Sequence, residues 1–241
     1  MCHNSSMRYL LFSIGCYLCG ISAIVATFLF MQFYLDTTVD SFDLSAASLN
    51  FLLFLIFPLQ HSLLARTGWK SWIHRRIHPL MERPLYVGTT GLVLGAVLWL
   101  WKPFGPILYS TPHRFPFDAA FFLSVILIIW TSLALGHFTL FGLTQGVAAW
   151  KGASLSDPPL NRNGPFRLVR HPLTTLLILA VWSHHALTAS RLEWNLLLSA
   201  YSLIGVVFEE RDLVKKYGDE YLEYRRNVPA FIPLLRFQTR A

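Results

Sequence analysis

Long apolar runs separated by short polar connections dominate the hydropathy pattern of this chain. Six runs can be marked, and several approach the roughly 20 residues that a helix needs to cross a hydrocarbon core of about 30 Å. They cover Tyr9–Tyr34, Ala46–Leu64, Leu85–Trp101, Phe117–Leu140, Pro172–Ala189 and Trp194–Phe208. The pattern predicts an all-α fold: a polytopic transmembrane helical bundle with five to six membrane segments.

The last two apolar runs are short, and the polar sequence SRLE at residues 190–193 joins them. A span of fewer than about 17 residues is marginal for a full crossing. We therefore predict that these runs form a helical hairpin, which crosses the bilayer or enters it incompletely. The polar tail that follows from Glu209 is expected to lie in the cytoplasm.

Composition agrees with a membrane environment. Hydrophobic residues make up 54% of the 241 residues and charged residues only 14%, well below the quarter or so that is typical of soluble domains. A net charge of +7 is also found in nucleic-acid-binding proteins, but here Lys and Arg lie in loops beside apolar runs. We expect the lipid bilayer as a partner, and neither nucleic acid nor an obligate protein partner.

Basic residues decide the predicted orientation, because cytoplasmic loops are enriched in Lys and Arg. The loop after the second run carries Arg66, Lys70, Arg75, Arg76 and Arg83, and the loop after the fourth carries Lys151, Arg162, Arg167 and Arg170. The first connection, DTTVDSFD, is acidic and suits the outer side. With six crossings, both basic loops and both termini are predicted to face the cytoplasm.

Two polar clusters lie where apolar runs meet the predicted cytoplasmic face. Gln60 and His61 belong to QHSLLAR at the end of the second run, and Arg83 and Tyr86 belong to ERPLY at the start of the third. Ionisable groups at membrane depth are costly, so their presence raises a functional hypothesis. The alternatives are that His61 marks the interface or bonds a neighbouring helix, and that ERPLY simply begins a helix.

A third cluster is divided between two distant segments, NGPFRLVRHP and EERDLVKKYGDEYLEYRRNVPAFIP. Arg167 and Arg170 in the first segment offer forked donors to a carboxylate. In the second segment, the carboxylates of Glu209 and Glu210 can hold ribose hydroxyls or an ammonium group, and three tyrosines add aromatic surface with polar tips. This collection suits a zwitterionic ligand that has a ribose and an aromatic base.

These two segments, in this order around an apolar hairpin, resemble the C-terminal half of the isoprenylcysteine carboxyl methyltransferase family of membrane methyltransferases. In the first half of the chain, FPLQHSLLAR and ERPLY look more like the NnrU and methanethiol S-methyltransferase branch. The resemblance implies a single integral-membrane domain, in which residues 1–150 form the substrate side and residues 151–241 carry the cofactor-binding motifs. It also implies that S-adenosyl-L-methionine binds in a pocket closed by the C-terminal segment.

The resemblance assigns cofactor-binding residues to both segments. The cofactor loop contains Gly164, Pro165, Arg170, His171 and Pro172, and the facing segment contains Glu209, Glu210, Arg211, Tyr221 and Tyr224. The chain departs from the family pattern at one point. An aromatic residue often follows the RHP triplet shortly afterwards, whereas this chain has Thr174 and Thr175.

Methyl transfer from a sulfonium needs no metal and no covalent enzyme intermediate, so alignment and activation suffice. Because a thiolate is a far better nucleophile than a thiol, we predict His61 as the base, with Gln60, Arg83 or Tyr86 positioning it or polarising the thiol through water. The predicted reaction converts methanethiol, a small volatile thiol, to dimethyl sulfide, with S-adenosyl-L-homocysteine as the other product, in a bacterial cytoplasmic membrane.

Three other hypotheses remain open at this point. One is methylation of a prenylcysteine or a lipid, which requires a wide lateral opening between helices. Another is an NnrU-like membrane protein that supports nitrogen-oxide metabolism without methyltransferase activity. A third is a reductase that uses a nicotinamide cofactor. Cofactor preference separates these classes, because only a methyltransferase should prefer S-adenosyl-L-homocysteine to NADPH.

Overall fold

A computed structural model describes residues 3–233 and, within them, has five helices that are long and apolar enough to cross a membrane. These spans are Met7–Tyr34, Leu44–Ala65, Pro79–Leu100, Phe115–Ala134 and Ala189–Tyr217. Large apolar side chains such as Trp99 and Phe115 are 87% and 83% exposed, which is costly in water and favourable in lipid. The predicted polytopic helical fold is confirmed, and the chain is a membrane-embedded protein.

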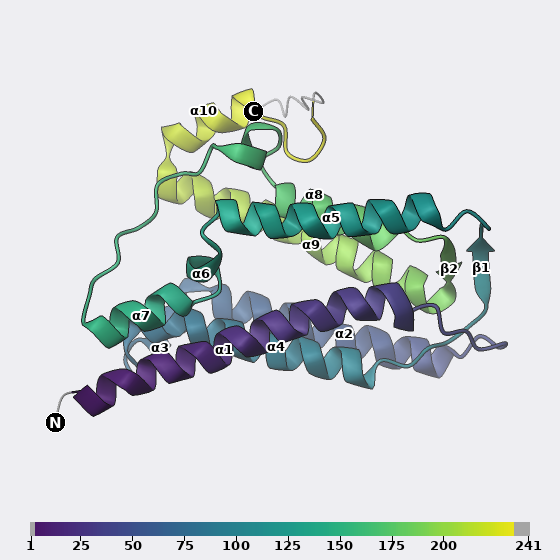
Figure 1. Ribbon diagram of the computed structural model, residues 1–241, viewed down its shortest axis with the longest axis horizontal. Coiled ribbons are helices and arrows are strands. Elements are labelled where there is room, and N and C mark those ends of the chain that lie inside the picture. Colours follow the sequence, from purple (N-terminus) through teal and green to yellow (C-terminus); the bar gives the residue numbers. More distant parts are fainter. Residues whose placement is uncertain (1–2, 234–241) are drawn as a thin grey trace. The chain divides into compact units, whose positions relative to one another are not determined.

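The helices are α1 (His3–Leu29), the π-helix η1 (Phe30–Tyr34), α2 (Leu44–Ala65), α3 (Thr67–Ile73), the 3₁₀-helix η2 (Pro79–Met81), α4 (Glu82–Leu100), α5 (Phe115–Ala134), α6 (His137–Leu140), α7 (Leu143–Lys151), the 3₁₀-helix η3 (Gly164–Arg167), α8 (Pro172–Trp182), α9 (Ala189–Tyr217) and α10 (Asp219–Asn227) (Figure 1). The strands are β1 (Ile107–Ser110) and β2 (Ala186–Thr188).

The chain divides into two compact units, each built from segments that are distant in the sequence. Unit 1 takes in Met1–Leu108, His137–Asp157 and Thr188–Glu193, and unit 2 takes in Tyr109–Gly136, Pro158–Leu187 and Trp194–Ala241. Unit 1 therefore holds α1 to α4, α6 and α7, whereas unit 2 holds α5, α8, α10 and most of α9.

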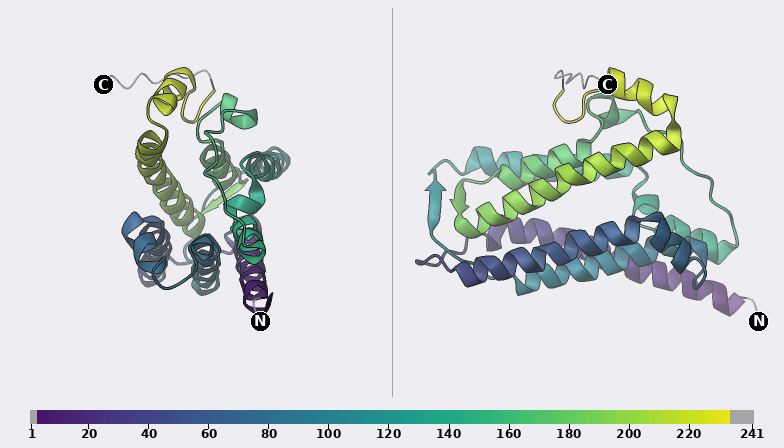
Figure 2. Two further views of the ribbon diagram at one scale, coloured as in Figure 1. Left: turned by 90° about the vertical axis from the view of Figure 1, so that its left-hand side faces the viewer. Right: turned by 180° about the vertical axis from the view of Figure 1, so that it is seen from behind.

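In unit 1, α1 packs along α4 and α7, and α2 packs on α4 (Figure 2). Small residues form the contact between α1 and α4: Cys16 and Cys19 meet Gly88 and Gly91. A Cβ atom added at Gly91 would lie 2.9 Å from the carbonyl oxygen of Cys19. Small residues let membrane helices approach closely, and close packing drives helix association in lipid. We call these four residues the α1–α4 seam.

The predicted boundaries of the last two apolar runs are wrong. The SRLE sequence was expected to connect two helices, but it lies inside α9, which runs over 29 residues from Ala189. Two interactions within unit 1 explain this. Arg191 has a side chain that is 2% exposed and pairs with Asp36 at 2.8 Å, and the hydroxyl of Thr188 accepts from the backbone N–H of Arg191 at 3.0 Å, as an N-cap does.

The fourth run was expected to continue helically to Leu140, and this is also wrong. α5 ends at Ala134, and Gly136 follows with φ of +82°, in the left-handed region that glycine favours. His137 then begins the short helix α6. Its Nε2 atom forms a hydrogen bond with the hydroxyl of Tyr17 at 3.0 Å.

In unit 2, α8 packs against α5, and the indole N–H of Trp182 at its end donates to the hydroxyl of Ser199 on α9 at 3.0 Å. α8 has 11 residues and is therefore only about 17 Å long. His171 precedes its first turn and contacts Glu210 near the end of α9. The chain therefore leaves and returns to the same end of unit 2, as the predicted hairpin requires (Figure 1).

Candidate functional site

The two predicted cofactor segments meet through the side chain of Arg170. Its Nε and Nη2 atoms donate to Glu210 Oε1 at 2.9 and 2.6 Å. Its Nη1 atom donates to the carbonyl oxygens of Arg225 and Val228 at 3.1 and 2.5 Å. The sequence predicted that Arg170 offers a fork to a carboxylate, and it does so, but the carboxylate is that of Glu210. Arg170 therefore joins the loop before α8 to α9 and to the C-terminal segment.

His171 lies between two carboxylates and is almost fully buried, with a side chain that is 3% exposed. Its Nδ1 atom is 3.3 Å from Glu209 Oε2, and its Nε2 atom is 3.1 Å from Glu210 Oε1. Burial alone would lower the pKa of His171, but the hydrogen bonds and charges of the two glutamates outweigh it and raise that pKa. The ring therefore favours the imidazolium form, which donates from both nitrogens.

The C-terminal segment is held against the same loop by its main chain. The backbone N–H of Arg170 donates to the carbonyl oxygen of residue 229 at 2.9 Å, and that of His171 donates to the carbonyl oxygen of residue 230 at 3.0 Å. The hydroxyl of Thr175 donates to the carbonyl oxygen of residue 231 at 3.2 Å. Thr175 stands near the point where the family pattern has an aromatic residue. An aromatic ring is nevertheless present, because Phe231 lies 5.8 Å from the His171 ring.

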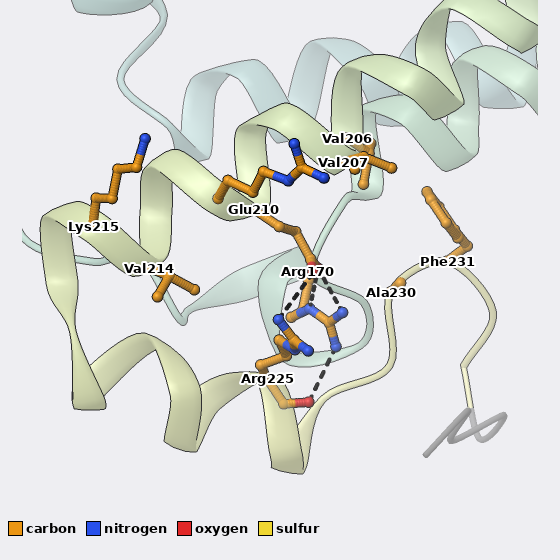
Figure 3. Close-up of a pocket in the computed structure, with 10 residues that line it drawn as sticks. Arg170, Val206, Val207, Glu210, Val214, Lys215, Arg225, Ala230 and Phe231 are labelled. Atoms are coloured by element: carbon orange, nitrogen blue, oxygen red, sulfur yellow. Dashed lines mark hydrogen bonds and ion pairs between the residues drawn. The ribbon is translucent and has the colours of Figure 1, made fainter. Parts of the chain in front are cut away.

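A pocket of about 630 Å³ opens beside this network (Figure 3). Its size falls within the range of small-molecule sites, about 300–1,000 Å³. It is lined by Arg170, Val206, Val207, Glu210, Arg211, Val214, Lys215, Arg225, Ala230 and Phe231. Apolar side chains thus share the pocket with charged groups of both signs, a combination typical of sites for small charged ligands.

Three of the predicted cofactor residues line this pocket, namely Arg170, Glu210 and Arg211. Others support the loop from behind. Tyr224 donates its hydroxyl to the carbonyl of Phe166 at 2.6 Å, and burial raises its pKa to about 12, so the hydroxyl keeps its proton. The ring of Tyr221, whose side chain is buried, lies 6.0 Å from that of Tyr224.

The remaining predicted residues shape the loop before α8. Gly164 begins η3 with φ of +58°, a conformation that glycine adopts without strain. Pro165 is buried in the same turn, and the buried Pro172 starts α8. Glu209 holds His171 and is otherwise more than half exposed, at 56%.

Sequence reasoning did not single out the apolar lining of the pocket. A usable signal exists on α9, where the lining positions 206, 210 and 214 and also 207, 211 and 215 recur every four residues and so share one helix face. Phe231 was within a quoted motif, but nothing in the sequence distinguishes it from other aromatic residues in the tail.

The predicted catalytic residues lie in unit 1, and two of them contact each other. The hydroxyl of Tyr86 and the Nε2 atom of His61 form a short hydrogen bond, and their rings are 4.9 Å apart. Gln60 Nε2 donates to the hydroxyl of Thr89 at 3.3 Å, and Arg83 Nε donates to the carbonyl of the last residue of α6 at 2.8 Å. A histidine nitrogen paired with a tyrosine hydroxyl is an arrangement suited to proton transfer.

Comparison with known proteins decides the family. The chain is 32% identical over 191 residues to the methanethiol S-methyltransferase of Mycobacterium tuberculosis, with 78% of each chain covered. It is 33% identical over 192 residues to methanethiol S-methyltransferase 2 of Bradyrhizobium diazoefficiens, with 79% of this chain and 74% of the relative covered. The chain belongs to the methanethiol S-methyltransferase family.

The chain is also similar to an animal protein. Nurim of Mus musculus is 29% identical over 195 residues and covers 75% of this chain. No family model matches the chain, and no solved structure matches it. Membership confirms the prediction of a membrane methyltransferase from the two segments around α8 and α9, and such an enzyme requires a methyl donor.

Proposed function

We propose that this protein transfers a methyl group from S-adenosyl-L-methionine to methanethiol, with dimethyl sulfide and S-adenosyl-L-homocysteine as products. One observation carries the proposal: in a member of the methanethiol S-methyltransferase family, the RHP and EE segments meet at a pocket of about 630 Å³. All the residues that line the pocket belong to unit 2.

The lining of the pocket supports the choice of methyl donor. Val206, Val214 and Phe231 offer apolar surface to an aromatic base (Figure 3). Glu210 Oε1 is engaged by protein donors, whereas Oε2 has Arg225 Nη1 at 3.8 Å, which is beyond hydrogen-bond length. Oε2 is therefore able to accept from a ribose hydroxyl or an ammonium group.

Positive charge at the rim supports binding of the donor's carboxylate. Arg211 and Lys215 lie one helical turn apart on α9 and both line the pocket. Their cationic groups suit a carboxylate ligand. When bound, the cofactor supplies a methyl group on a positively charged sulfur. The neutral sulfide that remains is a good leaving group, so no metal is needed.

The protein must then align the thiol and remove its proton. The sulfur of methanethiol forms a bond to the methyl carbon while the bond from that carbon to the donor sulfur breaks, and the electron pair of the broken bond stays on the donor sulfur. We assign proton removal to His61, with Tyr86 orienting its ring through their hydrogen bond. Gln60 and Arg83 are assigned to positioning, because both are themselves fixed by hydrogen bonds.

The test is production of dimethyl sulfide by the purified full-length protein, measured by headspace gas chromatography with S-adenosyl-L-methionine and methanethiol. His61→Ala is expected to lower turnover by about 10²–10⁴-fold and to leave S-adenosyl-L-homocysteine binding unchanged in calorimetry. His113→Ala is the matched control, because His113 is exposed.

Two results would count against this proposal. Folded protein that binds S-adenosyl-L-homocysteine but yields no dimethyl sulfide would redirect the function to prenyl or lipid thiols. Tighter binding of NADPH than of S-adenosyl-L-homocysteine would exclude methyl transfer at this pocket. Normal turnover by His61→Ala would overturn only the assignment of the base.

We also propose that the protein resides in a bacterial cytoplasmic membrane with both basic loops and both termini on the cytoplasmic side. The contact between His171 and Glu210 supports it, because the loop before α8 and the end of α9 must then share one side. Labelling with a membrane-impermeant maleimide tests this in a variant without native cysteines: Val39→Cys should react in intact cells, and Arg75→Cys only after the cells are opened. The reverse labelling pattern would show that the protein has the opposite orientation in the membrane.

A further inference from the structure

The short helix α3 follows the membrane span α2 after a single residue and places two tryptophans at the end of that span. The rings of Trp69 and Trp72 stack, with centroids 4.8 Å apart and planes inclined by 29°. Ile73, one helical turn after Trp69, is buried and anchors α3 in unit 1. Tryptophan is enriched where membrane proteins pass from hydrocarbon to headgroups, so α3 lies at the depth of lipid headgroups.

Basic side chains continue this aromatic surface. The guanidinium of Arg76 lies 3.8 Å from the ring centre of Trp72, and its Nη1 atom donates to the Trp72 carbonyl at 3.2 Å. Arg75, which precedes it, is exposed. We call Trp69, Trp72, Arg75 and Arg76 the α3 surface.

An acidic group that contacts α3, Glu82, is already engaged. The carboxylate of Glu82 lies 3.4 Å from Lys70 Nζ and 3.4 Å from His74 Nε2. Across residues 3–233, no carboxylate lies within ion-pair distance of Arg75 or Arg76. Two exposed arginines in the turn just after α3 therefore carry charge that no described carboxylate compensates.

Membrane orientation alone does not explain this arrangement. Positive charge beside a span sets topology by its presence, whatever the side-chain conformation. Here Arg76 is instead fixed on an indole that is itself stacked. A planar guanidinium held in place offers paired N–H donors that match two oxygens of a phosphate group.

We propose that the α3 surface binds the phosphate-bearing headgroups of anionic phospholipids. Arg75 and Arg76 donate to the phosphate oxygens, and the tryptophan rings pack against the glycerol and upper acyl region. A lipid is the occupant that fits, because the tryptophans hold the arginines at headgroup depth, where basic residues near a span attract anionic lipid.

The full-length protein is incubated in micelles that contain equal amounts of phosphatidylglycerol and phosphatidylcholine with identical acyl chains, and is then purified again. The experiment compares the amounts of the two lipids that remain bound. Lipid extracts are quantified by mass spectrometry. The wild-type protein is expected to retain phosphatidylglycerol preferentially. In R75Q/R76Q that preference should fall by about tenfold, because each basic residue near the surface contributes several-fold.

K102Q/R114Q is the matched control, since it removes two exposed basic residues elsewhere and lowers the net charge equally. This control should keep the wild-type preference, and an equal loss in both variants would overturn the proposal in favour of general charge attraction.

Trp72→Leu removes the ring beneath Arg76 and no charge, and it should lower the preference for phosphatidylglycerol about threefold. An unchanged preference in both Trp72→Leu and R75Q/R76Q would also overturn the proposal. Displacement of the lipid by millimolar inorganic phosphate would show a soluble-phosphate site instead.

Discussion

The α1–α4 seam of unit 1 and the charged cluster of unit 2, formed by Arg170, His171, Glu209 and Glu210, are held together in opposite ways. The seam has neutral, small residues whose backbones approach closely. The cluster joins distant segments through charged hydrogen bonds. Shape complementarity therefore holds the first region and charge complementarity the second. The seam should respond to added volume, and the cluster to lost charge and to pH.

The largest effect is expected when the cluster loses its shared carboxylate. Glu210→Gln keeps one side-chain oxygen but removes the negative charge that Arg170 and His171 both contact. Breaking a largely buried charge pair from one side costs about 3–5 kcal/mol. We expect a loss of that order in the free energy of unfolding, together with loss of S-adenosyl-L-homocysteine binding, as measured by denaturant titration and calorimetry.

Glu209→Gln is the control for this prediction. It removes a carboxylate that is 56% exposed and contacts only one side of His171 among the described residues. Exposed ion pairs contribute about 0–1 kcal/mol, so its effect should be several-fold smaller. Equal losses in the two variants would show that the shared contact with Arg170 does not matter.

A smaller effect is expected when volume is added to the seam. Gly91→Leu places carbon atoms against the α1 backbone, where even a Cβ would lie 2.9 Å from the Cys19 carbonyl oxygen. Overpacking costs about 1–3 kcal/mol, and the thermal midpoint should fall accordingly. Gly95→Leu on the same helix is the matched control, because a Cβ there meets nothing within 4 Å. A similar fall in Gly95→Leu would contradict the role of close packing at the seam.

The smallest predicted effect concerns how the stability of each region depends on pH: the cluster should respond to pH and the seam should not. The pKa of folded His171 is raised above its unfolded value of about 6.5. The stability from its protonation is therefore fully present below about pH 6.5 and is lost as the pH rises through the raised pKa. The stability difference between wild type and His171→Gln, measured by denaturant titration, should therefore shrink as the pH rises through that pKa.

Gly91→Leu supplies the comparison in the same pH series. Its stability difference from wild type should stay constant, because the added volume acts through packing and not through charge. A difference that shrinks equally for Gly91→Leu and His171→Gln would show that the trend belongs to the whole fold and not to the cluster.

Hydropathy predicted the spans well because burial in lipid depends on composition over about 20 residues. It failed for the start of α9 because a charged residue inside a helix is acceptable once it has a partner. Arg191 finds that partner in Asp36, 155 residues away in the sequence. No local pattern reports such a pair, so the SRLE sequence was assigned to a connection.

The candidate cofactor site was predictable to the extent that its residues are charged or have special backbone requirements. Arg170 and Glu210 stand out in the sequence, and Gly164 marks a turn. Val206, Val214 and Phe231 do not, because apolar residues are common in a membrane protein. Whether the predicted residues bind cofactor and perform catalysis stays a prediction, for which the variants above are the test.

The bonds from Arg170 to the carbonyls of Arg225 and Val228 also impose an order on biosynthesis. Val228 is added 58 residues after Arg170, and ribosomes add about 5–20 residues per second. The arginine therefore waits about 3–12 s at the membrane before its acceptors exist. The pocket is completed only after residues 229–231 have been added, so a chain that is terminated before them carries the spans and the Arg170 loop but no assembled site.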